Sequence, residues 1–321
     1  MKAVITDHEF PHIDNETEVL REAGIEMEVH QCRTPGEVIA KCADAEALLV
    51  QWAPLNAEAI AGLKKCKVIV RYGIGTDNVD LKSAAEKGIA VCNVPDYATG
   101  EVADHAVSLA LALGRQLPMV DARLRSGIWN IVPNDPMPSY RDMRFVTLGY
   151  GRIARGVLDR VRAFGFELAA YDPYVPAEVL LEAGVKPVTQ DEAFATADIL
   201  SLHLPLTEET RHVVNATSMR TMKKNAIIIN TSRGPLIDTV ALAEALTEKV
   251  VFAAGIDVYE KEPLEKDHPI LNAPRALLTS HMAWHSSASV ARLQKMVAEE
   301  AVRGLRGEAL RSQVNASLMA A

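Results

Sequence analysis

The chain has 321 residues, 49% of them hydrophobic and 24% charged, and its formal net charge is −8. That length exceeds what a single hydrophobic core usually serves, so two domains are expected. The acidic balance, without any run of lysines and arginines, argues against a nucleic-acid partner.

The first hundred residues alternate short apolar segments with helix-like segments. Strands are predicted at Lys2–Thr6, Glu26–His30, Ala47–Val50 and Val68–Val70. Helices are predicted at Thr17–Ala23, at Pro35–Lys41 and in a stretch that ends at Leu63. Strands that alternate with helices at this spacing predict βαβ units and a parallel sheet.

The middle of the chain changes character. Glu101–Arg115 is rich in Ala and Leu at helical spacing and predicts a long, largely buried helix that could carry the chain from one domain to the other. The next stretch, Ser126–Asp142, contains Pro133, Pro136 and Pro138. Proline opposes both helices and internal strands, so this stretch is predicted to be a loop or domain crossover.

A second alternating series follows. Strands are predicted at Phe145–Leu148, Glu167–Tyr171, Ile199–His203, Ala226–Asn230, Phe252–Asp257 and Ala276–Thr279, and helices at Arg152–Ala163 and Ser287–Gly304. Two consecutive series of this kind predict an α/β protein with two doubly wound parallel-sheet domains and a cleft between them.

The length of the apolar runs, the four cysteines and the segment Asp7–His12 bear on where the protein is located in the cell and on whether it binds a metal. No apolar run approaches the about 18 residues that span a bilayer, so no membrane partner is expected. The spacing of the four cysteines fits neither a zinc site nor a redox-active pair, which favours free thiols in a cytoplasmic protein over a disulfide. A metal site within Asp7–His12 is disfavoured because one short loop offers no supporting ligands, and no metal is predicted.

A glycine-rich segment follows the strand Phe145–Leu148 and opens the next predicted helix. Its pattern is Gly-x-Gly-x-x-Ala, from Gly149 to Ala154, in which Gly149 permits a tight turn and Gly151 lets the backbone approach a pyrophosphate. The N-terminus of the helix supplies N–H groups and a positive dipole end for the phosphates. The candidate cofactor-binding residues here are Gly149, Tyr150, Gly151, Arg152 and Ile153.

Asp172 stands 23 residues after Gly149, directly after the strand Glu167–Tyr171. An acidic residue at this place accepts hydrogen bonds from ribose hydroxyls and repels the additional phosphate of NADP. The alternative is that Asp172 only starts the turn Asp172–Tyr174. The order of strand, glycines, helix, strand and acid favours the first interpretation, with NAD as the cofactor.

Three segments with reactive side chains each follow an apolar strand: Asn230–Pro235, Asp257–Leu264 and Ser280–Trp284. The carboxyl ends of strands in a doubly wound sheet face its ligand, so these segments are expected to meet. Reduction of a 2-keto acid needs a cation for the carboxylate, a proton donor and an acid that holds that donor and raises its pKa. Arg233, His281 and Glu262 are the candidates. Each also has a simpler interpretation: a surface charge, a buried histidine and a solvated acid.

Together with Arg71–Asp80 and His203–Thr207, these motifs give the chain a resemblance to the D-isomer-specific 2-hydroxyacid dehydrogenases over essentially its whole length. The resemblance implies an NAD-dependent oxidoreductase that interconverts a small 2-keto acid and a D-2-hydroxy acid. It implies a flavodoxin-like substrate domain built from residues 1–100 and 288–321. It also implies a Rossmann NAD-binding domain over residues 101–287 and a homodimer formed through that domain.

The resemblance also implies roles for single residues. Arg233 would bind the substrate, His281 would be the general acid/base, and Glu262 would support His281. The backbone N–H groups of Ile74 and Gly75 would help to hold the substrate carboxylate. The further residues expected at the cofactor are Val102, His203, Pro205, Thr231 and Asp257, the last against the nicotinamide carboxamide.

Within the family, His281–Trp284, Pro95–Tyr97 and Glu101–His105 look most like the branch that contains the C-terminal-binding-protein corepressors. Trp284 would then be an aromatic wall over the substrate, and the alternative is a core tryptophan. The corepressor branch supplies the alternative function, an NAD-sensing scaffold that binds protein partners. Formate oxidation is disfavoured by Glu262, where formate dehydrogenases have glutamine. The chain ends soon after the helix Ser287–Gly304, so the regulatory extension of many phosphoglycerate dehydrogenases is expected to be absent, which lowers the case for serine biosynthesis.

Overall fold

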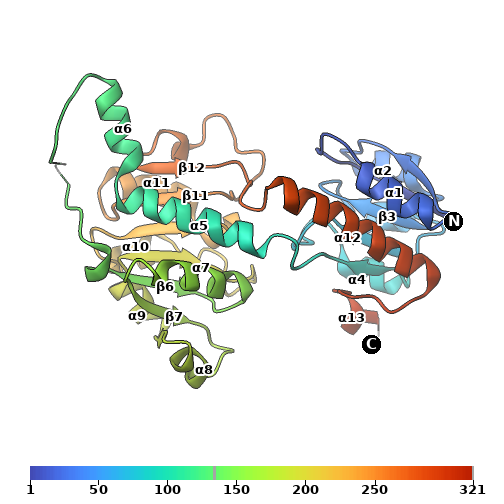
Figure 1. Cartoon of the computed structure of the whole chain (residues 1–321). Coiled ribbons are helices and arrows are strands. Elements are labelled where there is room, and N and C mark those ends of the chain that lie inside the picture. Colours follow the sequence, from blue (N-terminus) through green and yellow to red (C-terminus); the bar gives the residue numbers. More distant parts are fainter. Residues whose placement is uncertain (133–134, 320–321) are drawn as a thin grey trace. The chain divides into compact units, whose positions relative to one another are not determined.

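Two separate stretches of the chain form one unit, and the stretch between them forms another. The computed structural model describes residues 1–132 and 135–319, so Pro133 lies outside the described residues. Unit 1 comprises Met1–Ala98 with His285–Ala321, and unit 2 comprises Thr99–Trp284 (Figure 1). Each unit is built on one parallel sheet, as the alternating pattern predicted.

Unit 1 contains a five-stranded sheet in the order β2-β1-β3-β4-β5. This is the flavodoxin-like order of a doubly wound sheet. Its strands are β1 (Lys2–Ile5), β2 (Glu26–Val29), β3 (Ala47–Val50), β4 (Val68–Arg71) and β5 (Ala90–Cys92). Its helices are α1 (Asp14–Glu22), α2 (Pro35–Cys42), α3 (Ala57–Gly62), α4 (Leu81–Glu86), α12 (Ser287–Arg306) and α13 (Ala316–Met319).

Helix α12 belongs to unit 1, although it follows unit 2 in the chain. It packs against α1, β3 and β4 (Figure 1). A Cβ on Gly304 would lie 2.6 Å from the Cβ of Val68, so a glycine at this place allows α12 to approach the sheet closely. The buried Gln294 accepts from Asn15 Nδ2 at 2.8 Å and donates to the His12 carbonyl at 2.7 Å. These contacts hold the two stretches of unit 1 together.

Unit 2 contains a seven-stranded parallel sheet in the order β12-β11-β10-β9-β6-β7-β8. With the strands renumbered within the unit, this is the Rossmann order 3-2-1-4-5-6 extended by a seventh strand. The strands are β6 (Arg144–Leu148), β7 (Glu167–Tyr171), β8 (Lys186–Pro187), β9 (Ile199–Leu202), β10 (Ile227–Asn230), β11 (Ala253–Ile256) and β12 (Ala276–Leu278).

Helices cover both faces of the unit 2 sheet. They are α5 (Thr99–Gly114), α6 (Leu117–Arg125), α7 (Arg152–Arg162), α8 (Ala177–Glu182), α9 (Gln190–Thr196), α10 (Ala216–Thr221) and α11 (Thr239–Thr247), with the 3-10 turns η1 (Tyr140–Asp142), η2 (Gly234–Leu236) and η3 (Pro269–Asn272). Successive residues of β6 enter different cores: Phe145 packs with α5 and α7, and Val146 packs with α9 and α11. Because helices cover both faces of the sheet, these strands are continuous apolar runs in the sequence.

Two predicted features differ from the structure. Helix α5 begins at Thr99, the first residue of unit 2, so it lies inside that unit and does not carry the chain between the units. The described part of the proline-containing stretch is a loop within unit 2 that ends in the 3-10 turn Tyr140–Asp142, so it is not a crossover between the units. None of the helices over residues 1–132 and 135–319 combines the length and apolarity needed to cross a bilayer.

Candidate active site

The register of the unit 2 sheet aligns the predicted site segments. Leu148 at the end of β6 pairs with Tyr171 of β7 on one side and with Leu202 of β9 on the other. The row continues through Asn230 of β10, Ile256 of β11 and Leu278 of β12. A segment that the sequence singled out begins at, directly after, or one residue beyond each of these six residues. The predicted cofactor and catalytic segments of unit 2 therefore leave the same edge of one sheet.

The glycine loop has the geometry of a nucleotide-binding turn. Gly149 has a φ of +97°, and a Cβ at this position would lie 2.5 Å from the His203 carbonyl oxygen, so any side chain is excluded. At Gly151, a Cβ would meet no described heavy atom within 4 Å. Gly151 is also the N-cap of α7, and among the described residues no side chain caps this helix. The helix N-terminus can therefore receive an anion.

Asp172 connects the glycine loop to the turn after β7. Its Oδ2 accepts a hydrogen bond from Tyr150 N at 2.8 Å, and its Oδ1 accepts one from Tyr174 N at 3.0 Å. The second contact is the turn that formed the simpler interpretation of Asp172. The first places the carboxylate beside the glycine loop, where a ribose would lie.

The buried polar atoms near this loop that have no hydrogen-bond partner among the described residues include Oγ1 of Thr147 on β6, Nδ1 of His203 and Oγ1 of Thr231. Nε2 of His203 lies 2.9 Å from Ser201 Oγ. Burial lowers the pKa of His203 to about 3, so its imidazole is neutral near pH 7. Buried polar atoms without partners are rare, and a water molecule or a ligand can supply the missing partner. His203 and Thr231 were predicted to contact a cofactor, and the residues present fit a dinucleotide.

Arg233 begins the turn that follows β10. Its Nη1 donates to the Ser232 carbonyl at 2.8 Å, and its own carbonyl accepts from Asn230 Nδ2 at 2.9 Å. The next residue, Gly234, lies against another segment, since a Cβ here would be 1.9 Å from the carbonyl carbon of Tyr259. A glycine is thus required to bring the Arg233 turn against the segment that contains Glu262.

Glu262 and His281 form a hydrogen-bonded pair. His281 Nδ1 lies 2.6 Å from Glu262 Oε2, and the other carboxylate oxygen accepts from Tyr259 N at 2.9 Å. Burial raises the pKa of Glu262, but the contacts with His281 and the hydrogen bond from the Tyr259 backbone contribute to a net fall, and the pKa lies below its ordinary value. The nearby charge of Arg233 acts in the same direction. The pair therefore includes an ionised carboxylate that fixes the orientation of the imidazole.

Asp257 holds the backbone around His281. The carboxylate is fully buried, and its oxygens accept hydrogen bonds from the N–H groups of Met282 and Ala283, both at 2.9 Å. The N–H of His281 donates to the Asp257 carbonyl at 2.7 Å. The sequence had predicted a contact of Asp257 with nicotinamide. In the structure its carboxylate is directed to the His281 loop.

The remaining predicted residues lie in both units. Trp284 is partly buried, and its Nε1 donates to the His281 carbonyl at 2.9 Å, so it is attached to the His281 loop. Val102 on α5 is buried, and Pro205 after β9 is exposed. Ile74 and Gly75 lie in unit 1 after β4, where the Ile74 carbonyl accepts from Asn93 Nδ2 at 2.6 Å.

The sequence did not indicate His105 and Thr279 as site residues. Thr279 Oγ1 donates to Asp257 Oδ1 at 2.5 Å and lies 3.0 Å from His105 Nε2. His105 lies on α5, far from Thr279 in the chain. The one available signal was a polar histidine on the apolar face of a mostly buried helix.

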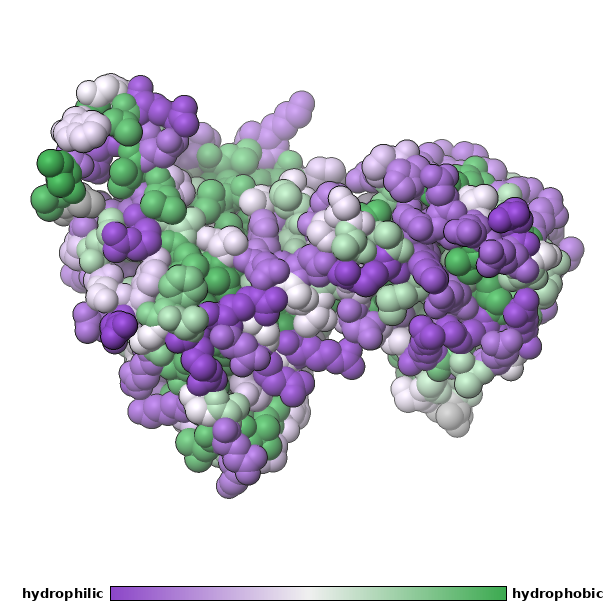
Figure 2. Space-filling model, in the orientation of Figure 1, coloured by the Kyte–Doolittle hydropathy of each residue, from purple (hydrophilic) through white to green (hydrophobic). Residues whose placement is uncertain are grey.

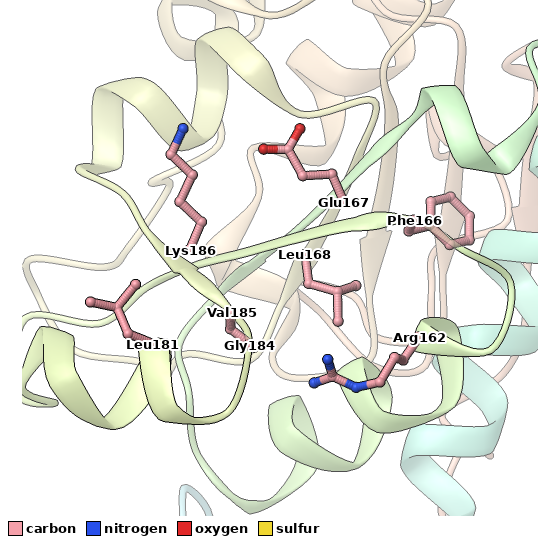
Figure 3. A pocket seen from close by; sticks show the side chains of 8 residues that line it. All are labelled: Arg162, Phe166, Glu167, Leu168, Leu181, Gly184, Val185 and Lys186. Carbon is pink, nitrogen blue, oxygen red and sulfur yellow. The ribbon is translucent and has the colours of Figure 1, made fainter.

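Figure 3 shows a surface pocket elsewhere in unit 2, lined in part by Arg162, Phe166, Glu167 and Lys186. Glu167 and Lys186 are the first residues of β7 and β8, so the pocket lies at the amino ends of these strands, opposite the edge that carries the site. It is therefore not the candidate active site. Within residues 1–132 and 135–319, no group of three or more His, Cys, Asp or Glu side chains is placed to hold a metal ion.

Comparisons with known proteins identify the family of this chain. The family pattern described as "D-isomer specific 2-hydroxyacid dehydrogenase, NAD binding domain" matches residues 107–283. A D-3-phosphoglycerate dehydrogenase of Methanocaldococcus jannaschii is 38% identical over 317 residues, which are 98% of this chain and 59% of that protein. A glyoxylate reductase of Korarchaeum cryptofilum is 36% identical over 87% of this chain and 85% of its own length.

The solved structure of a glyoxylate reductase from Paecilomyes thermophila superposes with a TM-score of 0.86 at 30% identity and covers 98% of both chains. This chain thus spans about three fifths of the archaeal phosphoglycerate dehydrogenase and most of the glyoxylate reductases. The corepressor alternative finds no support among these relatives.

Proposed function

Because the chain belongs to the D-isomer-specific 2-hydroxyacid dehydrogenase family, we propose that it reduces a small 2-keto acid to the D-2-hydroxy acid, with NAD(H) as the cofactor. The observation that carries the proposal is the 2.6 Å pair of His281 and Glu262 beside Arg233, at the sheet edge that also carries the glycine loop. NADH supplies the hydride for this reduction.

Three side chains of unit 2 perform the remaining chemistry. Arg233 holds the substrate carboxylate, since a guanidinium forms paired hydrogen bonds with a carboxylate. Glu262 occupies Nδ1 of His281, so Nε2 is the nitrogen that gives the proton to the carbonyl oxygen. The ionised Glu262 stabilises the imidazolium that must be present before transfer. In the reverse direction, neutral His281 takes the proton from the hydroxyl.

The cofactor is held by the segments that follow β6, β7, β9 and β10. The N-terminus of α7 and Gly149–Ile153 take the pyrophosphate, and Asp172 takes the ribose. His203 and Thr231 use their otherwise unpartnered polar atoms toward the cofactor. Val102, Pro205 and Asp257 remain candidates on the family resemblance.

Substrate selection is proposed for Trp284, which is attached to the His281 loop through its indole N–H. The family resemblance adds the backbone N–H groups of Ile74 and Gly75 in unit 1 as ligands of the carboxylate. Free thiols at all four cysteines fit a reducing compartment, and we place the enzyme in the cytoplasm.

Helix α6 supports a homodimer through the cofactor-binding unit. It projects from the rest of unit 2, and none of its nine residues, all of them described, is buried (Figure 1). The apolar side chains Leu124, Ile128, Trp129 and Ile131 are each more than half exposed. Figure 2 shows hydrophobic residues on this projection, at the upper left, beside hydrophilic ones. Large apolar side chains exposed close together in the chain are typical of an interaction surface, and a second copy of unit 2 would bury them.

The direct experiment follows NADH oxidation with a panel of 2-keto acids, from glyoxylate, hydroxypyruvate and pyruvate to branched, aromatic and phosphorylated compounds, with NADPH in parallel. We expect turnover with NADH on one chemical group of substrates and none after His281→Gln. The phosphorylated compounds test the likeness to phosphoglycerate dehydrogenases. A protein that binds NADH and reduces no member of the panel would contradict the proposal.

A further inference from the structure

A chain of polar groups connects α5 to the loop that carries His281. His105 Nε2 lies 3.0 Å from Thr279 Oγ1, and Thr279 Oγ1 lies 2.5 Å from Asp257 Oδ1. Asp257 then accepts from the N–H groups of Met282 and Ala283. His105 Nε2 is also 3.7 Å from Asp257 Oδ1. All of these residues belong to unit 2.

The directions of these hydrogen bonds follow from counting protons. The hydroxyl of Thr279 has one proton, and the carboxylate of Asp257 can only accept. The short contact therefore uses the Thr279 proton. Thr279 Oγ1 must then accept from His105, which places a proton on Nε2 of the imidazole. His105 is the first donor of a chain that ends on a fully buried carboxylate.

The loop at the end of this chain needs such support. His281 has a φ of +54°, a left-handed conformation that residues with a Cβ seldom adopt. Three hydrogen bonds from positions 281, 282 and 283 to Asp257 hold the loop in this shape. A buried carboxylate with too few donors would be costly, so removal of the Thr279 or His105 donor weakens the anchor of the loop.

We propose that His105 is a positioning residue that acts through Thr279 and Asp257 to hold the His281 loop in its reactive conformation. The inference rests on the proposed function of His281, because it assigns the network to that residue. In this scheme His105, on α5, touches neither substrate nor cofactor. Its effect should appear in the rate of the chemical step rather than in substrate binding.

The test compares variants that remove a donor with variants that keep it. His105→Leu and Thr279→Val remove a donor, whereas His105→Gln and Thr279→Ser keep an N–H or O–H at nearly the same place. Ser108→Ala on the same helix is the matched control, because its exposed hydroxyl bonds only to the Asp104 carbonyl in its own helix. For each variant we would measure kcat and KM for the preferred 2-keto acid and the hydrogen exchange of the peptide Ser280–Trp284.

Loss of one hydrogen bond of this chain corresponds to an effect of up to roughly tenfold. We therefore expect kcat of His105→Leu and Thr279→Val to fall by up to about tenfold, with little change in KM and faster exchange in Ser280–Trp284. His105→Gln and Thr279→Ser should remain near the wild type. The double variant His105→Leu/Thr279→Val should be no worse than the worse single variant, because both act on one chain.

The outcomes separate the two proposals. If the wild type reduces no 2-keto acid, the proposed function fails, while faster exchange in the donor-deficient variants still supports the anchoring role. If the wild type is active and these variants keep its kcat and its exchange, the positioning role is overturned. A higher KM at unchanged kcat also overturns it. Should His105→Leu fail to fold, the comparison of Thr279→Val with Thr279→Ser decides.

Discussion

His281 shows how one side chain depends on the backbone that presents it. The backbone of His281 has a left-handed conformation. Its N–H group and the two following N–H groups donate to Asp257, and its imidazole is hydrogen-bonded to Glu262. The side chain is thus fixed at both ends before any substrate arrives. A proton donor held in one orientation loses little entropy during the reaction.

Glu262→Gln tests the ion pair in the site. Glutamine is nearly isosteric but carries no charge, so it removes the interaction between carboxylate and imidazole that lowers the pKa of Glu262. We expect the pH optimum for keto-acid reduction to move to lower pH, with a lower maximal rate, in steady-state assays across pH 5 to 9. Glu265→Gln is the control, because Glu265 pairs with Lys261 in the exposed part of the same loop. An unmoved optimum would contradict the pairing.

Glu16 in unit 1 gives a prediction about stability. Burial raises its pKa from 4.5 to about 7, although the hydrogen bond from Tyr72 Oη at 2.9 Å opposes the rise. A carboxyl group with a raised pKa contributes full stability below its ordinary pKa and loses it as the pH rises through about 7. Glutamine cannot ionise. From pH 5 to pH 8 the free energy of unfolding of the wild type should therefore fall by on the order of 3 kcal/mol relative to that of Glu16→Gln.

Urea unfolding of both proteins at the two pH values measures this difference. Glu18→Gln is the control on the same helix, because Glu18 is exposed. A constant difference between wild type and Glu16→Gln at both pH values would show that Glu16 does not titrate in this range.

At the residue scale, the sequence indicated the chemistry but not the supporting contacts. Arg233, Glu262 and His281 could be selected because few residue types bind a carboxylate or transfer a proton near pH 7. The directed contact of Asp257 with the His281 loop could not be predicted. It depends on which N–H groups a buried carboxylate meets, and its support from His105 comes from a helix 174 residues away from Thr279.

At the scale of elements, close approach of backbones positions the site. Gly234 lies against Tyr259 and Glu260, and this contact joins the turn after β10 to the segment after β11. Glu260 adds to it, since its Oε2 accepts from Thr239 Oγ1 at the start of α11 at 2.5 Å and its Oε1 lies 2.6 Å from His212 Nε2. The spacing of Arg233 and Glu262 therefore depends on one residue without a side chain.

Gly234→Ala should damage both stability and activity. The added methyl group must displace backbone atoms, and overpacking of this kind costs about 1–3 kcal/mol. We expect a lower midpoint of thermal unfolding together with a large fall in kcat/KM, measured by calorimetry and the NADH assay. Gly36→Ala is the matched control, because a Cβ there meets no described atom within 4 Å. Wild-type behaviour of Gly234→Ala would show that the two segments do not need this contact.

Most strands could be predicted because the sheets are covered on both faces, which makes their strands continuous apolar runs. β5 and β8 were not identified, since they have three and two residues and leave too little pattern. Helix α1 begins at Asp14, earlier than the predicted Thr17, because its first turn carries Asp14 and buries Glu16. Because the buried residue of this turn, Glu16, is a carboxylic acid, the spacing of hydrophobic residues does not indicate that the turn is helical.

At the scale of the whole molecule, the α6 projection predicts assembly. Trp129 and Ile131 are 79% and 84% exposed, and charges at both positions would be buried without partners in a dimer. Trp129→Asp/Ile131→Asp should therefore shift the protein from two chains to one in light scattering coupled to size-exclusion chromatography. Tyr174→Asp is the control, because this side chain is 91% exposed on another part of unit 2. A wild type that elutes as one chain would rule out the dimer.

Unit 1 is made of two stretches of chain that are separated by all of unit 2. Its sheet edge is completed late, when Val314 N bonds to the Val91 carbonyl and Asn315 bonds to Val91 N and the Ile89 carbonyl. Unit 2 is one continuous stretch. On the ribosome, unit 2 can therefore reach its final structure while unit 1 still lacks α12. During that time, β3 and β4 are not covered by this helix. The nascent chain thus exposes the apolar face of its first-made sheet for the longest time, and that face is where a chaperone would be needed.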